Sequence, residues 1–187
     1  MRRVRARPLR ACAVTLVACV ATLAAASAHA RLPVPWRALA LDPAPPGVRA
    51  PDFTLPDLAG RAVRGADLRG RWVVLNFWAS WCTPCEMEMP SMQRLQDRFQ
   101  PGVLEVVAVN HREAAADVRR FASRQGVDFR ILLDRDGSVS ARYQVATLPF
   151  TVILDPRGDV VAGAEGPRDW ASRDALDLFQ ALIRRKP

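Results

Sequence analysis

An apolar run from Trp72 to Phe77, interrupted only by Asn76, leads within a few residues to the segment Cys82–Cys85, which reads Cys-Thr-Pro-Cys. A strand that is apolar on both of its alternating faces is typical of the buried centre of a parallel or mixed sheet. Such a strand needs layers of structure on both sides. The run therefore restricts the chain to a layered α/β architecture and places two cysteines where a central strand ends.

The rest of the chain alternates between strand and helix patterns. Strands are expected at residues 53–55, 62–63, 71–77, 103–109, 131–133, 150–154 and 160–162. Helices are expected at residues 83–99, 114–125, 139–143 and 170–183. The order predicts an α/β fold with a mixed central sheet flanked by helices and an N-terminal β-hairpin extension.

The first 30 residues are typical of a targeting segment. Five arginines among the first ten residues precede an apolar stretch over 11–28, and Ala28-His29-Ala30 forms a small-x-small cleavage site. We predict a cleaved signal peptide. A membrane anchor through 11–28 and a lipid attached to Cys19 are the alternatives. All three predict an exported protein, in the periplasm or at the outer face of the cytoplasmic membrane.

The remaining residues suffice for one domain. Residues 31–50 are rich in proline and aperiodic, so they are expected to form a linker or extended arm, and the folded domain is expected at 51–187. The net charge of +8 falls to about +3 without the five N-terminal arginines. Nucleic-acid binding is therefore not expected.

The cysteines are informative because so few remain after the targeting segment. Cys12 and Cys19 lie within that segment, which leaves Cys82 and Cys85. A disulfide that closes so short a loop stabilises little, so reactivity explains the pair better. The positive end of a helix favours a thiolate, which predicts an exposed nucleophile at Cys82 and a resolving thiol at Cys85.

Metal binding is a weaker interpretation of the same pair. Zinc prefers four ligands, and beyond these two thiols the domain offers only His111, which we interpret as a surface or strand-end residue. No metal and no cofactor are expected beyond the redox-active disulfide between Cys82 and Cys85.

The run Val73–Cys85, followed by Glu-Met-Glu-Met-Pro at 86–90, resembles the TlpA/ResA-like thioredoxin family. The resemblance extends over residues 51 to about 184. It implies a thioredoxin fold and an extracytoplasmic thiol-disulfide oxidoreductase. Asn76 stands where ordinary thioredoxins keep a buried aspartate, and Glu88 matches an acidic residue that the family holds near its active site.

A third matching segment, Thr147–Thr151, corresponds to the one in which thioredoxin folds carry a cis-proline facing the two cysteines. A cis bond between Leu148 and Pro149 would leave backbone groups free to pair with an extended substrate. Trp81, Thr83 and Pro84 complete the expected substrate-binding residues.

Glu88 is the expected proton acceptor for Cys85. It lies three residues further along the same helix, and Asn76 cannot take a proton. Burial beside a thiol would raise the pKa of the carboxyl group. The alternative is a solvated carboxylate at the start of the helix.

The leading hypothesis is a reductase of disulfides in exported proteins. The resemblance implies targets in cytochrome c maturation or in copper-site assembly of cytochrome oxidase, and a membrane electron donor for re-reduction. An oxidant or isomerase of periplasmic disulfides is the alternative in direction. A peroxiredoxin-type thiol peroxidase fits poorly. The active site of that class resembles P-x-x-x-T-x-x-C, but here Leu75 stands at the proline position and Ala79 at the threonine position before Cys82. A metallochaperone or other non-catalytic binding module is a further alternative.

Overall fold

The computed structural model describes residues 36–100 and 102–185. The chain divides into two units, residues 1–31 and 32–187, and every described residue lies in the second. The predicted targeting segment, with its cleavage site and Cys19, lies outside the described residues. Within the described part, no helix has the length and apolar character needed to cross a bilayer.

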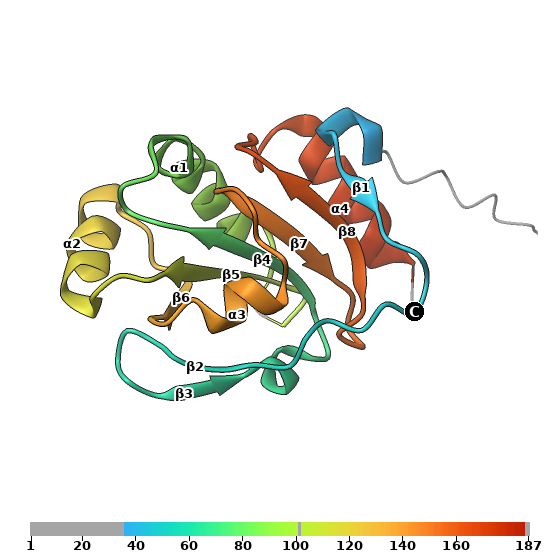
Figure 1. The fold of residues 1–187 in the computed structure, drawn as a ribbon. Coiled ribbons are helices and arrows are strands. Elements are labelled where there is room, and N and C mark those ends of the chain that lie inside the picture. The colour runs from blue at the N-terminus through green and yellow to red at the C-terminus, as the bar shows by residue number, and fades with distance from the viewer. Residues whose placement is uncertain (1–35, 101, 186–187) are drawn as a thin grey trace, which may run out of the picture. The chain divides into compact units, whose positions relative to one another are not determined.

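A mixed six-stranded sheet forms the centre of this unit, in the order β1-β8-β7-β4-β5-β6 (Figure 1). Strand β4 pairs in parallel with β5, and β5 with β6, whereas β7 runs antiparallel to both β4 and β8. A separate hairpin joins β2 and β3. The strands are β1 (Asp42–Pro43), β2 (Thr54–Pro56), β3 (Ala62–Arg64), β4 (Trp72–Trp78), β5 (Leu104–His111), β6 (Arg130–Asp134), β7 (Phe150–Leu154) and β8 (Val160–Glu165).

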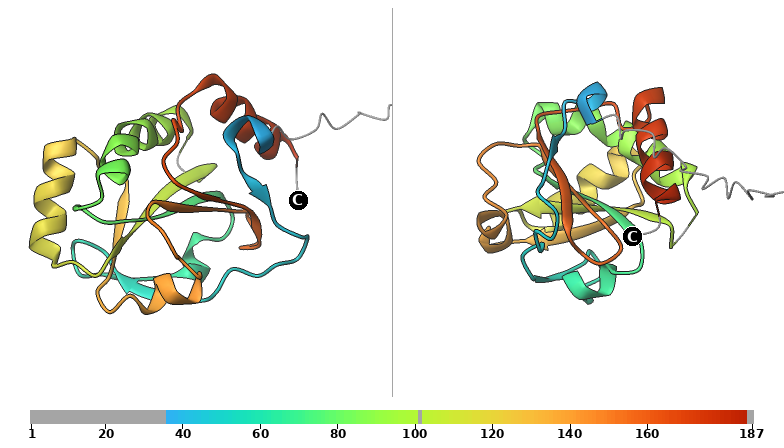
Figure 2. Two further views of the ribbon diagram at one scale, coloured as in Figure 1. Left: turned by 45° about the horizontal axis from the view of Figure 1, so that its top comes forward. Right: turned by 90° about the vertical axis from the view of Figure 1, so that its right-hand side faces the viewer.

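Helices cover both faces of the sheet, as Figures 1 and 2 show. One core cluster joins α1, α2 and α4 to one face, and a second joins α3, the hairpin and the 3₁₀ helix η2 to the other. The helices are η1 (Trp36–Leu39), η2 (Gly65–Leu68), α1 (Thr83–Arg98), α2 (Ala115–Gln125), α3 (Ser138–Arg142) and α4 (Arg173–Arg184).

Strand β4 holds the two layers together because all seven of its residues are buried. Val74 and Trp78 face the α1 side, where the Trp78 ring lies 4.8 Å from that of Phe121 between centroids. Val73 and Phe77 face the hairpin side. Full burial of an aliphatic or aromatic side chain contributes about 1.5–3 kcal/mol. The prediction of a strand buried on both faces is confirmed.

Residues 31–50 are expected to form a linker or an extended arm, and their described part forms an arm that packs on the domain. The arm contains η1, and β1 pairs with β8 through Asp42 opposite Gly163, so β1 is the strand at this edge of the sheet. Leu39 and Leu41 are buried in the α1-side core. These two leucines give the arm enough apolar surface to pack, although its prolines prevent a periodic pattern.

The last helix also differs from the prediction, which started it at residue 170. Ser172 is the N-cap residue, and its side chain accepts a hydrogen bond from the backbone N–H of Ala175 at 3.3 Å. A serine in this role fixes the first turn of a helix. Trp170 therefore lies before α4, fully buried in the core.

Candidate active site

The two predicted cysteines lie where β4 ends and α1 begins. Cys82 is the N-cap residue of α1, and its sulfur accepts a hydrogen bond from the backbone N–H of Cys85 at 3.3 Å. Pro84 lies in the first turn, where a missing N–H costs no intrahelical bond. The free N–H groups of this turn favour negative charge on the sulfur of Cys82.

Cys82 and Cys85 form a disulfide, with their Cα atoms 5.3 Å apart. Cys82 is 6% exposed and Cys85 is fully buried. The two sulfurs are therefore unequal, because an incoming thiol or disulfide can approach only the outer one. This is the asymmetry expected of a nucleophile and a resolving thiol.

The Leu148–Pro149 bond is cis, as predicted. Pro149 directly precedes β7, whose first residue Phe150 pairs with Phe77 of β4. The antiparallel register therefore places the start of β7 at the same end of the sheet as the exit from β4. The carbonyl of Pro149 accepts a hydrogen bond from the backbone N–H of Gly166 at 2.8 Å.

A pocket of about 430 Å³ opens beside Cys82. The loop before α1 and the first turn of α1 form one wall, and the loop before the cis bond forms another. Pro149, a predicted substrate-binding residue, does not line this pocket. The other four predicted substrate-binding residues do: Trp81, Thr83, Pro84 and Leu148. Trp81 is 67% exposed, so it offers apolar surface to a partner rather than to the core.

Glu88 lies on α1 one turn beyond Cys85 and is only 2% exposed. One carboxylate oxygen accepts a hydrogen bond from Asn76 Nδ2 at 2.8 Å. The other accepts from Trp170 Nε1 at 3.1 Å and from the backbone N–H of Arg168 at 3.2 Å. The alternative of a solvated helix carboxylate is therefore wrong.

Burial raises the pKa of Glu88 from an ordinary 4.5 to about 7, although the hydrogen bonds from Trp170, Asn76 and Arg168 oppose the shift. Loss of hydration disfavours the charged form more than three donors stabilise it. A carboxyl group with a pKa near neutrality can both accept and return a proton under ordinary conditions.

The sequence analysis identifies none of the three groups as a donor to Glu88. It singles out Asn76 only because Asn76 interrupts an apolar strand and cannot take a proton, and Trp170 and Arg168 lie about 80 residues from Glu88 along the chain. Trp170 resembled the first residue of a helix, and the N-cap serine at 172 was the signal that it was not.

A second carboxylate, Glu113, holds the loop that leads to the cysteines. It accepts hydrogen bonds from the backbone N–H and the hydroxyl of Ser80, and from Asn110 Nδ2 at 2.6 Å. The loop after β4 is thereby fixed to the end of β5. His111, the last residue of β5, also lines the pocket.

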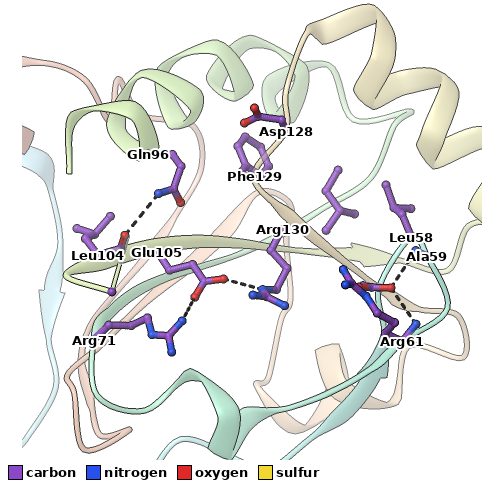
Figure 3. A pocket seen from close by; sticks show the side chains of 13 residues that line it. Leu58, Ala59, Arg61, Arg71, Gln96, Leu104, Glu105, Asp128, Phe129 and Arg130 are labelled. Atoms are coloured by element: carbon purple, nitrogen blue, oxygen red, sulfur yellow. Dashed lines mark hydrogen bonds and ion pairs between the residues drawn. The ribbon is translucent and has the colours of Figure 1, made fainter. Parts of the chain in front are cut away.

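A larger pocket of about 600 Å³ lies against β5, β6 and the hairpin, away from the cysteines (Figure 3). Glu105 lies between Arg71 and Arg130, at 2.6 Å from each guanidinium. Arg61 pairs with Asp57 at 2.8 Å. Each of these charges already has a partner of opposite sign. Across the described residues, no group of three or more His, Cys, Asp or Glu is arranged to hold a metal ion.

Residues 46–162 match the AhpC/TSA family. The chain belongs to this family. Among curated members of the wider group, the chain is similar to the thiol-disulfide oxidoreductase ResA of Geobacillus thermodenitrificans, with 46% identity over 61% of this chain and 66% of the relative. It is also similar to ResA of Halalkalibacterium halodurans, with 37% identity over 74% of this chain and 77% of the relative. The match thus spans slightly less than two thirds of the first of these proteins.

Solved structures give the same relationship for this AhpC/TSA member. A secreted Mycobacterium tuberculosis disulfide oxidoreductase, homologous to E. coli DsbE, superposes with a TM-score of 0.60 at 30% identity over 70% of this chain and 96% of that one. A thiol:disulfide interchange protein of the thioredoxin family from Chlorobium tepidum superposes with a TM-score of 0.62 at 25% identity. The match covers 72% of this chain and 96% of that protein. The predicted thioredoxin fold and the resemblance to ResA-like proteins are confirmed. The relatives that share this domain with the chain are thiol-disulfide oxidoreductases.

Proposed function

We propose that the protein is an extracytoplasmic thiol-disulfide reductase that acts on disulfides of exported proteins. The observation that carries the proposal is the unequal pair at the tip of α1, with Cys82 facing a pocket and Cys85 buried next to a carboxyl group of raised pKa. A purely structural disulfide needs neither the pocket nor the carboxyl group.

In the first step, the reduced Cys82 sulfur attacks one sulfur of a substrate disulfide. The substrate S–S bond breaks, a mixed disulfide forms, and one substrate thiol leaves. The apolar surface of Trp81 and the backbone beside the cis bond at Leu148 would hold the extended substrate chain.

In the second step, the Cys85 sulfur attacks Cys82 and releases the second substrate thiol. Two electrons have then passed from the Cys82–Cys85 dithiol to the substrate. Cys85 must lose a proton in a fully buried place, and Asn76 cannot accept it. Glu88 would take this proton and later return it when the disulfide is reduced again.

The proposed location rests on the targeting features of residues 1–30 and on the secreted relative from Mycobacterium tuberculosis. A membrane electron donor would re-reduce the pair, since cytoplasmic reductants cannot reach an exported domain. The resemblance to ResA-like proteins favours targets in cytochrome c maturation or in copper-site assembly of cytochrome oxidase. An oxidant or isomerase of periplasmic disulfides is the alternative direction, which the reduction potential decides.

A trapping experiment tests the proposal. The Cys85→Ser variant, produced in an intact cell envelope, should accumulate mixed disulfides between Cys82 and exported proteins. Cys82→Ser is the matched control and should trap none, because its remaining sulfur is buried. If Cys85→Ser carries no partner while wild type cycles between dithiol and disulfide in glutathione buffers, the protein is not an oxidoreductase of exported substrates.

Membership of the AhpC/TSA family makes a thiol peroxidase the second candidate. The positions that peroxiredoxins fill with proline and threonine hold Leu75, which is buried in β4, and Ala79. Neither can donate a hydrogen bond from its side chain to a peroxide. Purified protein is therefore expected to consume hydrogen peroxide no faster than free cysteine does; faster turnover would favour the peroxidase.

A further inference from the structure

The imidazole of His111 lines the pocket beside Cys82 and has no role in the two exchange steps described above. His111 ends β5 and lines the pocket, and its Nδ1 lies 3.0 Å from the hydroxyl oxygen of Ser140. The other residues that line the pocket carry apolar or hydroxyl side chains: Trp81, Thr83, Pro84, Val145, Ala146, Thr147 and Leu148. Cys82 and His111 are thus the two lining residues that carry a sulfur nucleophile and an imidazole.

The hydrogen bonds around Ser140 determine which nitrogen of His111 carries the proton. The Ser140 hydroxyl donates to Asp134 Oδ2 at 2.7 Å. A hydroxyl has one hydrogen, so towards His111 the serine oxygen must accept. Nδ1 therefore carries the hydrogen of the neutral ring, and Nε2 keeps its lone pair.

Asp134 is the last member of the hydrogen-bonded series His111–Ser140–Asp134. It is fully buried at the end of β6, and its carboxylate accepts the backbone N–H of Val139 at 3.1 Å and that of Ser140 at 2.7 Å. The start of α3 and the orientation of the serine hydroxyl are thereby fixed. In the part of the chain that the structure describes, His111 lines the pocket and no hydrogen bond engages its Nε2.

We propose that His111 carries the proton in the first step of the exchange, a role that rests on the proposed reductase function. Nε2 takes the proton of the Cys82 thiol. The Cys82 sulfur then attacks the substrate disulfide, the substrate S–S bond breaks as the mixed disulfide forms, and Nε2 gives the proton to the departing substrate sulfur. One proton moves from Cys82 to the leaving thiol, and the charge of the pocket is the same before and after.

The chemistry of the leaving group explains why this transfer matters. An alkyl thiolate is basic, with an ordinary pKa of about 8.5, and it leaves into a pocket walled by apolar side chains. Protonation as it departs avoids a poorly solvated charge there. Glu88 is buried on the same helix as Cys85 and does not line the pocket, so it serves Cys85 and not this leaving group.

The test compares two disulfides that differ in the basicity of the leaving thiol. In a Cys85→Ser background, which isolates the first step, 5,5′-dithiobis(2-nitrobenzoate) releases a weakly basic aromatic thiolate and oxidised glutathione releases a basic alkyl one. Both probes carry carboxylates. The ratio of their second-order rate constants cancels any change in the thiolate fraction of Cys82. His111→Gln is expected to raise the aromatic-to-alkyl ratio at least about tenfold, a lower bound beneath the roughly 10²–10⁴-fold typical of general acid–base catalysis.

His111→Asn is the matched control. Its side-chain amide can replace Nδ1 as the donor to Ser140 but cannot transfer a proton, so the ratio should rise as in His111→Gln. Ser140→Ala keeps the imidazole and removes its acceptor, and should give a smaller rise. Circular dichroism confirms that each variant is folded.

Three results distinguish the possibilities. An unchanged ratio in both His111 variants would falsify the proton-transfer role while leaving the proposed function intact. A wild-type ratio in His111→Asn alone would also overturn it, because the hydrogen bond to Ser140 would then be the whole effect. A Cys85→Ser protein that reacts with neither probe would contradict the proposed function itself.

Discussion

Glu88 carries three hydrogen bonds that favour its charged form, yet burial keeps its pKa at about 7. The balance has a consequence for folding. In the unfolded chain the carboxyl group ionises near 4.5, so between pH 4.5 and 7 the folded state holds a proton that the unfolded state has lost. The stability that Glu88 contributes is therefore complete below pH 4.5 and declines up to about pH 7.

Glu88→Gln should remove this pH dependence. Urea unfolding of wild type is expected to show a loss of stability on the order of 3 kcal/mol between pH 4.5 and 8 from this group, and the variant should not show it. Glu86→Gln is the control, since Glu86 is exposed on the same helix. Parallel pH profiles for wild type and Glu88→Gln would contradict the assignment.

The same substitution should slow the second step of exchange. A preformed mixed disulfide between Cys82 and a chromogenic thiol releases that thiol when Cys85 attacks. In wild type the rate should rise as Glu88 loses its proton through pH 7. In Glu88→Gln it should be at least about tenfold lower at pH 7. Equal rates across pH 5–9 would show that Glu88 takes no part.

Individual residues could be predicted when they break a local pattern. Asn76 interrupts an apolar strand, and Glu88 is a carboxyl group one turn after a cysteine at a helix N-terminus. His111 appeared to be an ordinary strand-end residue, because its partner Ser140 belongs to α3. Contacts between distant segments depend on the register of the sheet, which no local pattern contains.

At the scale of elements, Arg168 joins the N-terminal arm to the segment that carries Trp170. Its guanidinium donates to the carbonyls of Leu39 at 2.6 Å and Ala40 at 2.7 Å. It also donates to the carbonyls of Glu165 and Gly166. One side chain thus satisfies backbone groups at the end of η1 and at the end of β8, with the residue that follows each.

Arg168→Ala should loosen the arm without changing the backbone hydrogen bond from residue 168 to Glu88. Loss of these donors is expected to cost about 1–3 kcal/mol. Hydrogen exchange provides the measurement: the amide of Ala44, which donates to Val161 at 3.0 Å, should exchange faster, whereas amides of β4 should not. Arg168→Lys should behave similarly, because an ammonium cannot form the same fork.

Helix α2 ends at Gly126, which has φ +63° and donates to Ala122 and Ser123. The sequence predicted a glycine after the last turn, and the left-handed conformation explains it. Gly126→Ala should cost about 1 kcal/mol in thermal unfolding, because a Cβ atom disfavours this conformation. Gly126→Asn should cost less; a larger loss for Asn than for Ala would contradict the explanation.

The accuracy of the element predictions followed the strength of the local signal. Strand β4 and helix α2 have clear apolar patterns and end where predicted to within a residue or two. Strand β1 has two residues, one of them a proline, and exists because β8 offers it backbone partners. Helix α4 was predicted to start three residues early because Trp170 continues the apolar pattern while pointing into the core.

At the scale of the whole domain, the sheet topology assembles the site. Strands β4 and β5 are parallel, so the cysteines after β4 and His111 at the end of β5 reach the same edge. Strand β7 runs antiparallel to β4, so its start, with Pro149 before it, reaches that edge too. Ligands bind outside the carboxyl ends of parallel strands for the same reason in other α/β folds. The location of the site was therefore predictable once the strand order was known.

The pairing of the N-terminal arm with β8 affects whether copies of the protein aggregate. Residues 42–50 occupy backbone groups on the side of β8 that faces away from β7: β1 pairs with β8, and the carbonyl of Val48 accepts the N–H of Val160 at 2.8 Å. At the opposite border, Asp57 forms a bridge with Leu132 of β6. Uncovered strands of this kind recruit other chains and promote aggregation. A protein that begins at residue 50 should form oligomers in light scattering that one beginning at residue 36 does not, which gives this proline-rich stretch a protective role against strand exchange.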